Sequence, residues 1–199
     1  MAISAEQVKE LRTATGAGIL ECKKALEEAS GDFDKAVEIL RKRNQATAVK
    51  KMSREAKDGK VAVYLHGEGR IGVLVEVNSE TDFVARSDVF NEFVKEVCLQ
   101  VAAMAPLVVS REDLPADLVE KQKEIFAAQV ADQKKPPEVV ARIIEGKLAK
   151  WYSEVCLLDQ TYIRDDTKKV RDLLTEVVGR TGENVRIRRF ARYELGEGL

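Results

Sequence analysis

What this 199-residue chain lacks excludes several kinds of chemistry. Its single histidine, His66, excludes Ser–His–Asp triads and metal sites built from several histidines. It has no Walker sequence and no Cys-x-x-Cys motif, and its carboxylates lie on solvated helix faces with no histidine or buried aromatic nearby to tune them. We therefore expect no enzyme activity, no cofactor and no metal. Cys22, Cys98 and Cys156 are odd in number and widely scattered among apolar residues at helical spacing, which predicts buried, reduced thiols.

A strong charge of one sign and a long apolar run are also missing. The 33 basic and 34 acidic residues nearly cancel to a formal charge of −1, so only local patches could attract nucleic acid or an anionic membrane. No apolar run approaches the roughly 18 residues of a membrane span. The amino terminus leads straight into a polar helix pattern, without a visible signal peptide. These absences predict a cytoplasmic protein with no membrane partner and no direct nucleic-acid partner.

Three short helices are predicted at the amino terminus. Ser4 and Gln7 form a capping-box pattern, and glycines at 16 and 18 end the first helix. Asp32 can cap the third helix, after a glycine that stops the second. The second helix is predicted to bury one face made of Ile19, Cys22, Leu26 and Ala29.

A change of composition after this bundle marks a boundary. From residue 41 to residue 60, eight lysines or arginines face only Glu55 and Asp58, and almost nothing apolar recurs with a period. Such a run is typical of a solvated helix extension or linker, although it could also contact RNA. We predict a bundle domain at 1–45, a basic linker at 46–60 and a core domain at 61–199.

The core pattern then changes from helical to alternating. Residues 61–66 and 71–77 alternate around a glycine-containing turn, which predicts a β-hairpin. The turn matches the dinucleotide-binding pattern G-x-G-x-x-G, but a β-branched run follows Gly72 where that site needs a helix. Helices are expected from Ser87, over 118–130, from Pro136 to Val155 and after a cap at Thr167, followed by a final strand over 185–193. The fold class is therefore α+β.

The loop over residues 78–86 is the least ordinary feature. A strand that buries four aliphatic side chains should be followed by a polar turn, yet this turn carries Phe83 beside Asp82. A loop mounted between a strand and a helix can present an aromatic ring to a partner as a wedge. The same ring could instead fold back as an ordinary core anchor, and composition does not separate these two interpretations.

Three stretches of the sequence together resemble bacterial elongation factor Ts, in its short form with one core copy. They are residues 8–26, with Thr15-Gly16-Ala17-Gly18 at their centre, the loop 78–86, and the ending 184–190. The resemblance implies a ubiquitin-associated-like three-helix bundle, followed by a core in which a small antiparallel sheet packs with helices. It also implies a translation elongation factor, the guanine-nucleotide exchange factor that acts on elongation factor Tu.

The resemblance assigns roles to individual residues. In relatives the loop enters the GTPase near its bound Mg²⁺, which implies this role for Thr81, Asp82, Phe83 and Val84. Docking of the bundle on the GTPase is implied for Arg12, Ile19 and Leu20, with Leu20 exposed beside a core-facing Ile19. Longer members carry two core halves, so this chain is expected to form a homodimer, through Trp151, Tyr152 or the final strand.

Two other functions remain open at the level of sequence. A protein-binding adaptor would use the bundle alone. An RNA-binding module would use the basic 41–60 segment together with the late arginines Arg186, Arg188, Arg189 and Arg192. Neither function explains the loop at 81–84.

Overall fold

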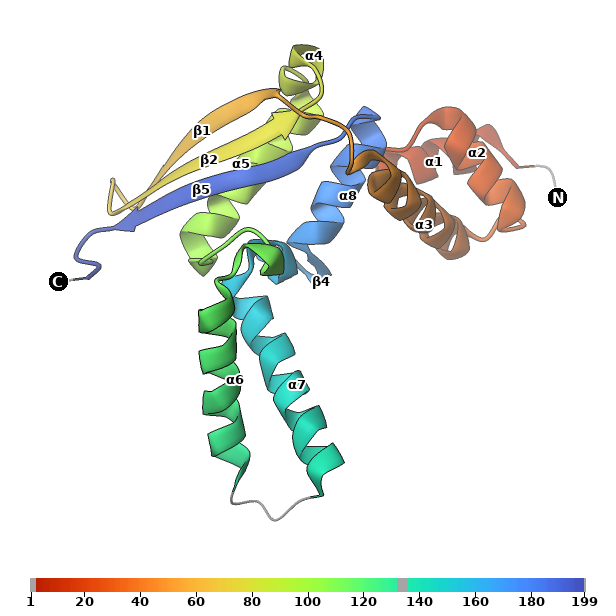
Figure 1. The fold of residues 1–199 in the computed structure, drawn as a ribbon. Coiled ribbons are helices and arrows are strands. Elements are labelled where there is room, and N and C mark those ends of the chain that lie inside the picture. Colours follow the sequence, from red (N-terminus) through yellow and green to blue (C-terminus); the bar gives the residue numbers. More distant parts are fainter. Residues whose placement is uncertain (1–2, 132–135, 199) are drawn as a thin grey trace. The chain divides into compact units, whose positions relative to one another are not determined.

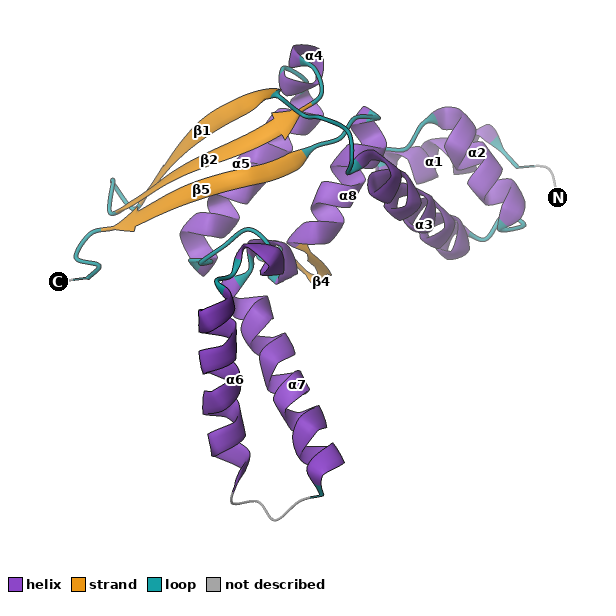
Figure 2. Ribbon diagram, viewed as in Figure 1, coloured by secondary structure: helices purple, strands orange, loops and turns teal. Residues whose placement is uncertain are grey.

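The computed structural model describes residues 3–131 and 136–198, which divide into two compact units. The first unit comprises Met1–Val61, Val77–Val94 and Asp172–Arg186. The second comprises Ala62–Glu76, Lys95–Arg171 and Ile187–Leu199. Helices and strands both contribute, as Figure 2 shows by colour, and the predicted α+β class is confirmed.

The amino-terminal helices form the predicted bundle from α1 (Ala5–Thr15), α2 (Ile19–Glu28) and α3 (Phe33–Lys51) (Figure 1). The capping box at Ser4 is present, and Gly16 closes α1 in the left-handed conformation at φ +67°. The Asp32 side chain accepts a hydrogen bond from the Lys35 amide and caps α3. The core of the bundle is apolar and small, consisting of Val8, Leu11, Ala17, Cys22, Ala25, Leu26, Ala29, Ala36 and Leu40.

The predicted hairpin is confirmed as β1 (Asp58–His66) and β2 (Ile71–Ser79). The final strand is also confirmed, as β5 (Arg186–Glu194), and the sheet has the order β1-β2-β5. Gly67 and Gly69 take positive φ values of 58° and 86° in the turn, a region that glycine adopts at no steric cost. Gly72 lies inside β2, so the glycines turn a hairpin and no helix follows them.

Helices make up most of the remaining chain. After the short α4 (Asp82–Ala85), the Ser87 hydroxyl accepts a hydrogen bond from the Phe90 amide at the start of α5 (Asp88–Met104). A pair of longer helices, α6 (Ala116–Val130) and α7 (Pro137–Val155), runs antiparallel and side by side within the second unit (Figure 1). Pro137 occupies the first turn of α7, where a missing amide costs nothing.

One prediction about the carboxyl-terminal half is wrong. Thr167 does not cap a helix; it lies in β4 (Asp165–Lys169), which pairs with β3 (Thr161–Tyr162). The Thr167 amide and hydroxyl both donate to the Asp165 carboxylate, and α8 (Val170–Thr181) begins three residues later. The charged run over 165–169 has no apolar alternation, so the pattern that identifies a strand is absent there.

Candidate partner-binding site

The loop between β2 and α5 holds its own single turn of helix, α4. The Thr81 hydroxyl accepts a hydrogen bond from the Val84 amide at 3.4 Å and so caps this turn. Asp82 lies in the first turn, where its charge suits the helix dipole, and it pairs with Arg86 at 2.8 Å. Both of those charged side chains are exposed, so the ion pair adds little stability.

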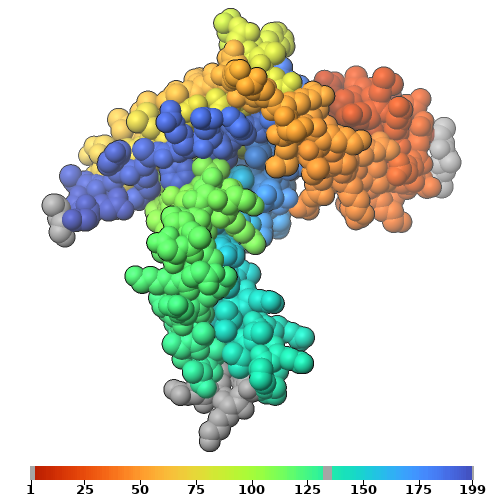
Figure 3. Space-filling view, viewed as in Figure 1, coloured from red at the N-terminus to blue at the C-terminus, as the bar shows by residue number. Residues whose placement is uncertain are grey.

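The alternatives for Phe83 are now decided. Its side chain is 81% exposed, whereas the next two residues, Val84 and Ala85, are buried. In the space-filling view the α4 segment projects at the surface (Figure 3). Full burial of a phenylalanine is worth about 1.5–3 kcal/mol, and this ring forgoes most of that. The core interpretation is wrong, and the ring is available to a partner.

The predicted docking residues lie on the two sides of one turn. Arg12 is exposed in the last turn of α1, and Ile19 and Leu20 open α2, with only the Gly16–Gly18 turn and the end of α1 between them. Leu20 is 72% exposed, as expected.

The expectation that Ile19 faces the core is wrong, because its side chain is 57% exposed. Ile19 is the first residue of α2, and the buried Ala17 occupies the core at that end of the helix. The buried face of α2 begins at Cys22 and continues through Ala25 and Leu26. Two neighbouring aliphatic side chains are therefore exposed at the start of α2, where one was expected.

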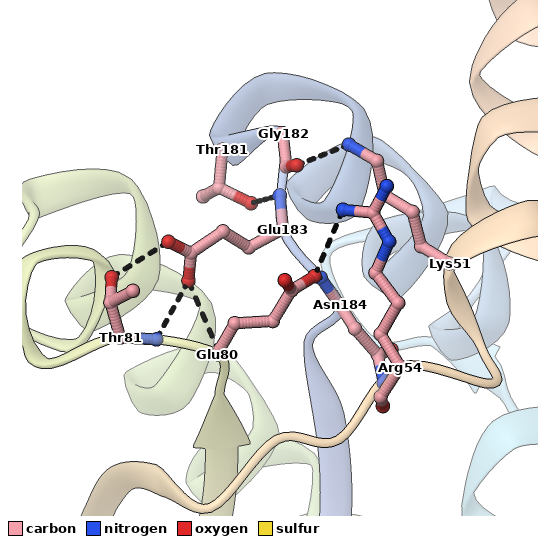
Figure 4. Close-up of polar contacts among 8 residues, drawn as sticks. All are labelled: Lys51, Arg54, Glu80, Thr81, Thr181, Gly182, Glu183 and Asn184. Atoms are coloured by element: carbon pink, nitrogen blue, oxygen red, sulfur yellow. Dashed lines mark hydrogen bonds and ion pairs between the residues drawn. The ribbon is translucent and has the colours of Figure 1, made fainter.

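Sequence reasoning missed the side chains that hold the α4 loop. Glu183 accepts hydrogen bonds from the amides of Glu80 and Thr81, at 3.1 and 3.0 Å, and from the Thr81 hydroxyl at 2.7 Å (Figure 4). These residues are 102 or 103 positions apart in the chain. No local sequence pattern around Glu183 indicates the contact. It could have been predicted only by knowing that the 80–81 and 183–184 segments lie side by side.

The basic segment at 41–60 is largely paired inside its own unit. Arg41 pairs with Asp172 at 3.3 Å, Arg43 pairs with Glu28 at 2.6 Å, and Lys51 donates to the carbonyl oxygen of Gly182. In the second unit, the late arginines Arg188 and Arg189 both pair with Glu76, and Arg192 pairs with Glu194 and Glu197. These ion pairs offset part of the positive charge that would attract an RNA backbone.

The buried thiols are unreactive. Cys22, Cys98 and Cys156 are free and buried, as predicted. Desolvation by burial raises the pKa of Cys22, and it raises the pKa of both Cys98 and Cys156 to about 11. At neutral pH the thiolate, which is the nucleophile and metal ligand, is therefore scarce.

Neither a metal centre nor a membrane segment is found in the described part of the chain. Over residues 3–131 and 136–198, no group of three or more His, Cys, Asp or Glu side chains could hold a metal ion. None of the described helices combines the length and apolar character that a membrane span requires. The structure instead presents exposed apolar side chains, such as Leu20 and Phe83, on ordered helices, which suits binding to another protein.

Comparison with known proteins identifies the family. A model of the family described as "Elongation factor TS" matches residues 4–197. The chain is 59% identical over 198 residues to an elongation factor Ts of Thermotoga petrophila, covering 100% of this chain and 98% of that protein. It is 56% identical over 197 residues to one of Caldanaerobacter subterraneus subsp. tengcongensis, covering 99% and 98%, and 55% identical to one of an Anaeromyxobacter species, covering 99% and 90%. The chain therefore belongs to the elongation factor Ts family of translation elongation factors.

Proposed function

We propose that this protein is the guanine-nucleotide exchange factor of elongation factor Tu. It binds the GDP-bound GTPase and promotes GDP release with the loop at Thr81, Asp82, Phe83 and Val84. The observation that carries this proposal is the 81% exposure of Phe83 on a helical turn that Thr81 caps, with Thr81 itself hydrogen-bonded to Glu183.

The physical mechanism is displacement of the GTPase groups that hold Mg²⁺. In a GTPase the ion bridges the nucleotide phosphates and protein ligands, so disturbing its support weakens nucleotide binding. Phe83 acts as an apolar wedge, and the adjacent Val84, whose side chain is buried, anchors the turn. Burial of the ring in the GTPase provides the free energy that opposes nucleotide binding, and no bond is made or broken.

The bundle acts as a separate docking surface in this proposal. Arg12, Ile19 and Leu20 would contact the GTPase, which gives a purpose to two exposed aliphatic side chains at one turn. The division into a bundle at 1–45, a basic linker at 46–60 and a core at 61–199 belongs to this proposal too.

We also propose that two copies of the chain pair through the open face of the hairpin. Val63 and Leu65 in β1 are 67% and 66% exposed. A Cβ atom on Gly72 would lie 3.6 Å from the Leu65 side chain, so Gly72, and by alternation Leu74, share that face. A two-fold axis places the same patch on both copies, so each apolar face would be covered by its counterpart on the other copy.

The dimer proposal has a direct measurement. Sedimentation at micromolar concentration should give a dimer, and Leu65→Lys should give a monomer because the face then carries a charge. A wild-type protein that sediments as a monomer and exchanges GDP at full rate would contradict it. Trp151 and Tyr152 are less suited to the interface, since both are partly buried and Tyr152 already packs under the Arg111 guanidinium at 4.7 Å.

The decisive experiment compares two titrations in the presence of Mg²⁺. An exchange factor lowers nucleotide affinity, and linkage requires that nucleotide lower the affinity of the factor by the same ratio. The protein should therefore bind nucleotide-free elongation factor Tu much more tightly than the GDP-saturated form. Equal dissociation constants would favour an adaptor, and strongly salt-dependent binding to RNA would favour an RNA-binding module.

A further inference from the structure

Two pairs of adjacent residues bind each other reciprocally beneath the exposed loop. Glu183 accepts from the backbone amides of Glu80 and Thr81, while the Glu80 carboxylate accepts from the backbone amide of Asn184 at 2.6 Å (Figure 4). Each segment thus contributes one carboxylate and backbone amides to the other. The loop before α4 is tied to the α8–β5 connection at these points, all within the first unit.

A third segment joins the same cluster from the end of α3. The Arg54 guanidinium pairs with Glu80 at 3.6 Å, and the Arg54 carbonyl oxygen accepts from the Asn184 side chain at 2.7 Å. Lys51 donates to the Gly182 carbonyl oxygen. The α8–β5 connection is therefore itself held in place, which makes it a firm support for the loop.

Glu183 has a particular place in this cluster because it acts on the cap of α4. The Thr81 hydroxyl donates its one proton to Glu183 and uses a lone pair to accept from the Val84 amide. Removing the carboxylate would free that proton to point elsewhere and would release two amides at once. The path from Glu183 to the turn that carries Phe83 is two hydrogen bonds long.

A single turn of helix needs such support. Helices this short are not stable alone, because nucleation costs more than one or two hydrogen bonds return. The turn is closed by bonds from Ala85 to Thr81 and from Arg86 to Asp82, at 3.3 and 3.1 Å. Its direction relative to the rest of the first unit then depends on further contacts: burial of its own Val84, hydrogen bonds from Ser87 and Asn91 to its carbonyl oxygens, and the bonds between the preceding residues and Glu183.

We propose that Glu183 is a positioning residue for nucleotide release, which holds the α4 turn ready so that the Phe83 ring meets the GTPase without prior ordering. This inference rests on the proposed exchange function. If the loop were loose, part of the binding free energy of the ring would be spent on ordering it. The loss would appear in the nucleotide-free complex, where the wedge is engaged, and much less in docking on the GDP-bound form.

The test uses three substitutions at position 183 in the full-length protein. Glu183→Ala removes all three acceptor contacts. Glu183→Asp keeps the charge but is one methylene shorter, so it cannot reach both amides and the hydroxyl. Glu183→Gln keeps the reach: its carbonyl oxygen can accept from the amides, and its amide group can donate to the Thr81 hydroxyl. Glu96→Gln is the matched control, because that carboxylate accepts from Tyr162 and Arg164 at 2.7 Å within the second unit.

The order of GDP-release rates among the variants distinguishes a positioning role of Glu183 from an effect of its charge or of misfolding. Glu183→Ala and Glu183→Asp should lower the maximal rate of GDP release by about ten-fold, equivalent to about 1.4 kcal/mol, with an unchanged half-saturating concentration. Glu183→Gln should stay within about three-fold of wild type, and the Glu96→Gln control should match wild type. Hydrogen exchange of the Glu80 and Thr81 amides should accelerate in the Ala and Asp variants.

Three results would overturn the proposal. They are wild-type exchange by a folded Glu183→Asp protein, a larger loss in Glu183→Gln than in Glu183→Asp, and slow hydrogen exchange of the Glu80 and Thr81 amides in the Asp variant. If Glu183→Ala fails to fold, the Asp and Gln variants still give the order. Failure of the exchange function itself would look different, because the wild-type protein would then not accelerate GDP release at all.

Discussion

Replacement of Phe83 by alanine tests function separately from folding. The side chain is 81% exposed, so it retains about a fifth of the burial that is worth about 1.5–3 kcal/mol for a full phenylalanine. Truncation should then cost the free protein about 0.3–0.6 kcal/mol. The better helix propensity of alanine offsets part of this cost. The melting temperature should hardly move.

In the complex with the GTPase the same arithmetic gives a larger effect. Covering the exposed four fifths of the ring contributes about 1.2–2.4 kcal/mol, and the Phe83→Ala protein loses it. Each 1.4 kcal/mol is a factor of ten, so stimulated GDP release should slow by about 7-fold to 50-fold. Stopped-flow fluorescence of labelled GDP, with elongation factor Tu and a series of factor concentrations, measures this rate.

The control for Phe83→Ala is Leu107→Ala, which truncates another large apolar side chain that is 61% exposed and lies outside the proposed contacts. That variant should release GDP at the wild-type rate. A correctly folded Phe83→Ala protein that also matches wild type would refute the wedge. An equal loss in the two variants would show that the assay reports surface apolarity and not this loop.

Three further changes test other parts of the structure. Leu20→Asp combined with Arg12→Glu should weaken binding to the GTPase in calorimetry. Both side chains are exposed, so circular dichroism should still show a folded bundle. Wild-type affinity would mean that the bundle docks through another surface. Gly59→Ala should lower the free energy of unfolding by about 1–3 kcal/mol or more, measured by denaturant titration. The backbone φ of Gly59 is +135°, and the new Cβ would lie 2.2 Å from the Val77 carbonyl oxygen in β2. An unchanged denaturation midpoint would show that the strand can shift. Burial raises the pKa of Cys98 and Cys156 to about 11, above their usual 9.0, so their stabilising contribution is complete below about pH 9 and is lost as the pH rises toward 11. The free energy of unfolding should fall less between pH 9 and pH 11 in a Cys98→Ala, Cys156→Ala protein. The same pH dependence as wild type would contradict the raised pKa values.

Features that depend on neighbours in the sequence could be predicted. The caps at Ser4, Asp32 and Ser87 are all present, because a cap is a contact between a side chain and an amide three residues away. The hairpin and the final strand also follow from alternation and turn chemistry. In each case the physical cause lies within a few residues of its effect.

Predictions failed where the cause lies farther away. Ile19 has the right spacing for the core face of α2, but Ala17 is the residue buried at that end of the core, and Ile19 is exposed. The strand β4 has no alternation, and it is set by pairing with β3, in which Thr161 lies opposite Lys169. Periodicity describes one element at a time, so it does not show where the neighbouring elements end.

The exposure of Phe83 is the clearest case, and it explains why the site itself could not be derived from the sequence. The pattern around it allows the ring to lie inside or outside. In the structure the Val84 side chain of the same turn is buried instead, and Glu183 binds Thr81, the residue before the turn, from 102 positions away. A ring kept out of the core forgoes burial free energy in the free protein. A fold retains such a feature only if the remaining contacts hold the loop without help from the ring, and the reciprocal bonds between the 80–81 and 183–184 segments meet that requirement. The support of the loop and the exposure of the ring are therefore two consequences of one arrangement, and a change at Glu183 should be felt at Phe83.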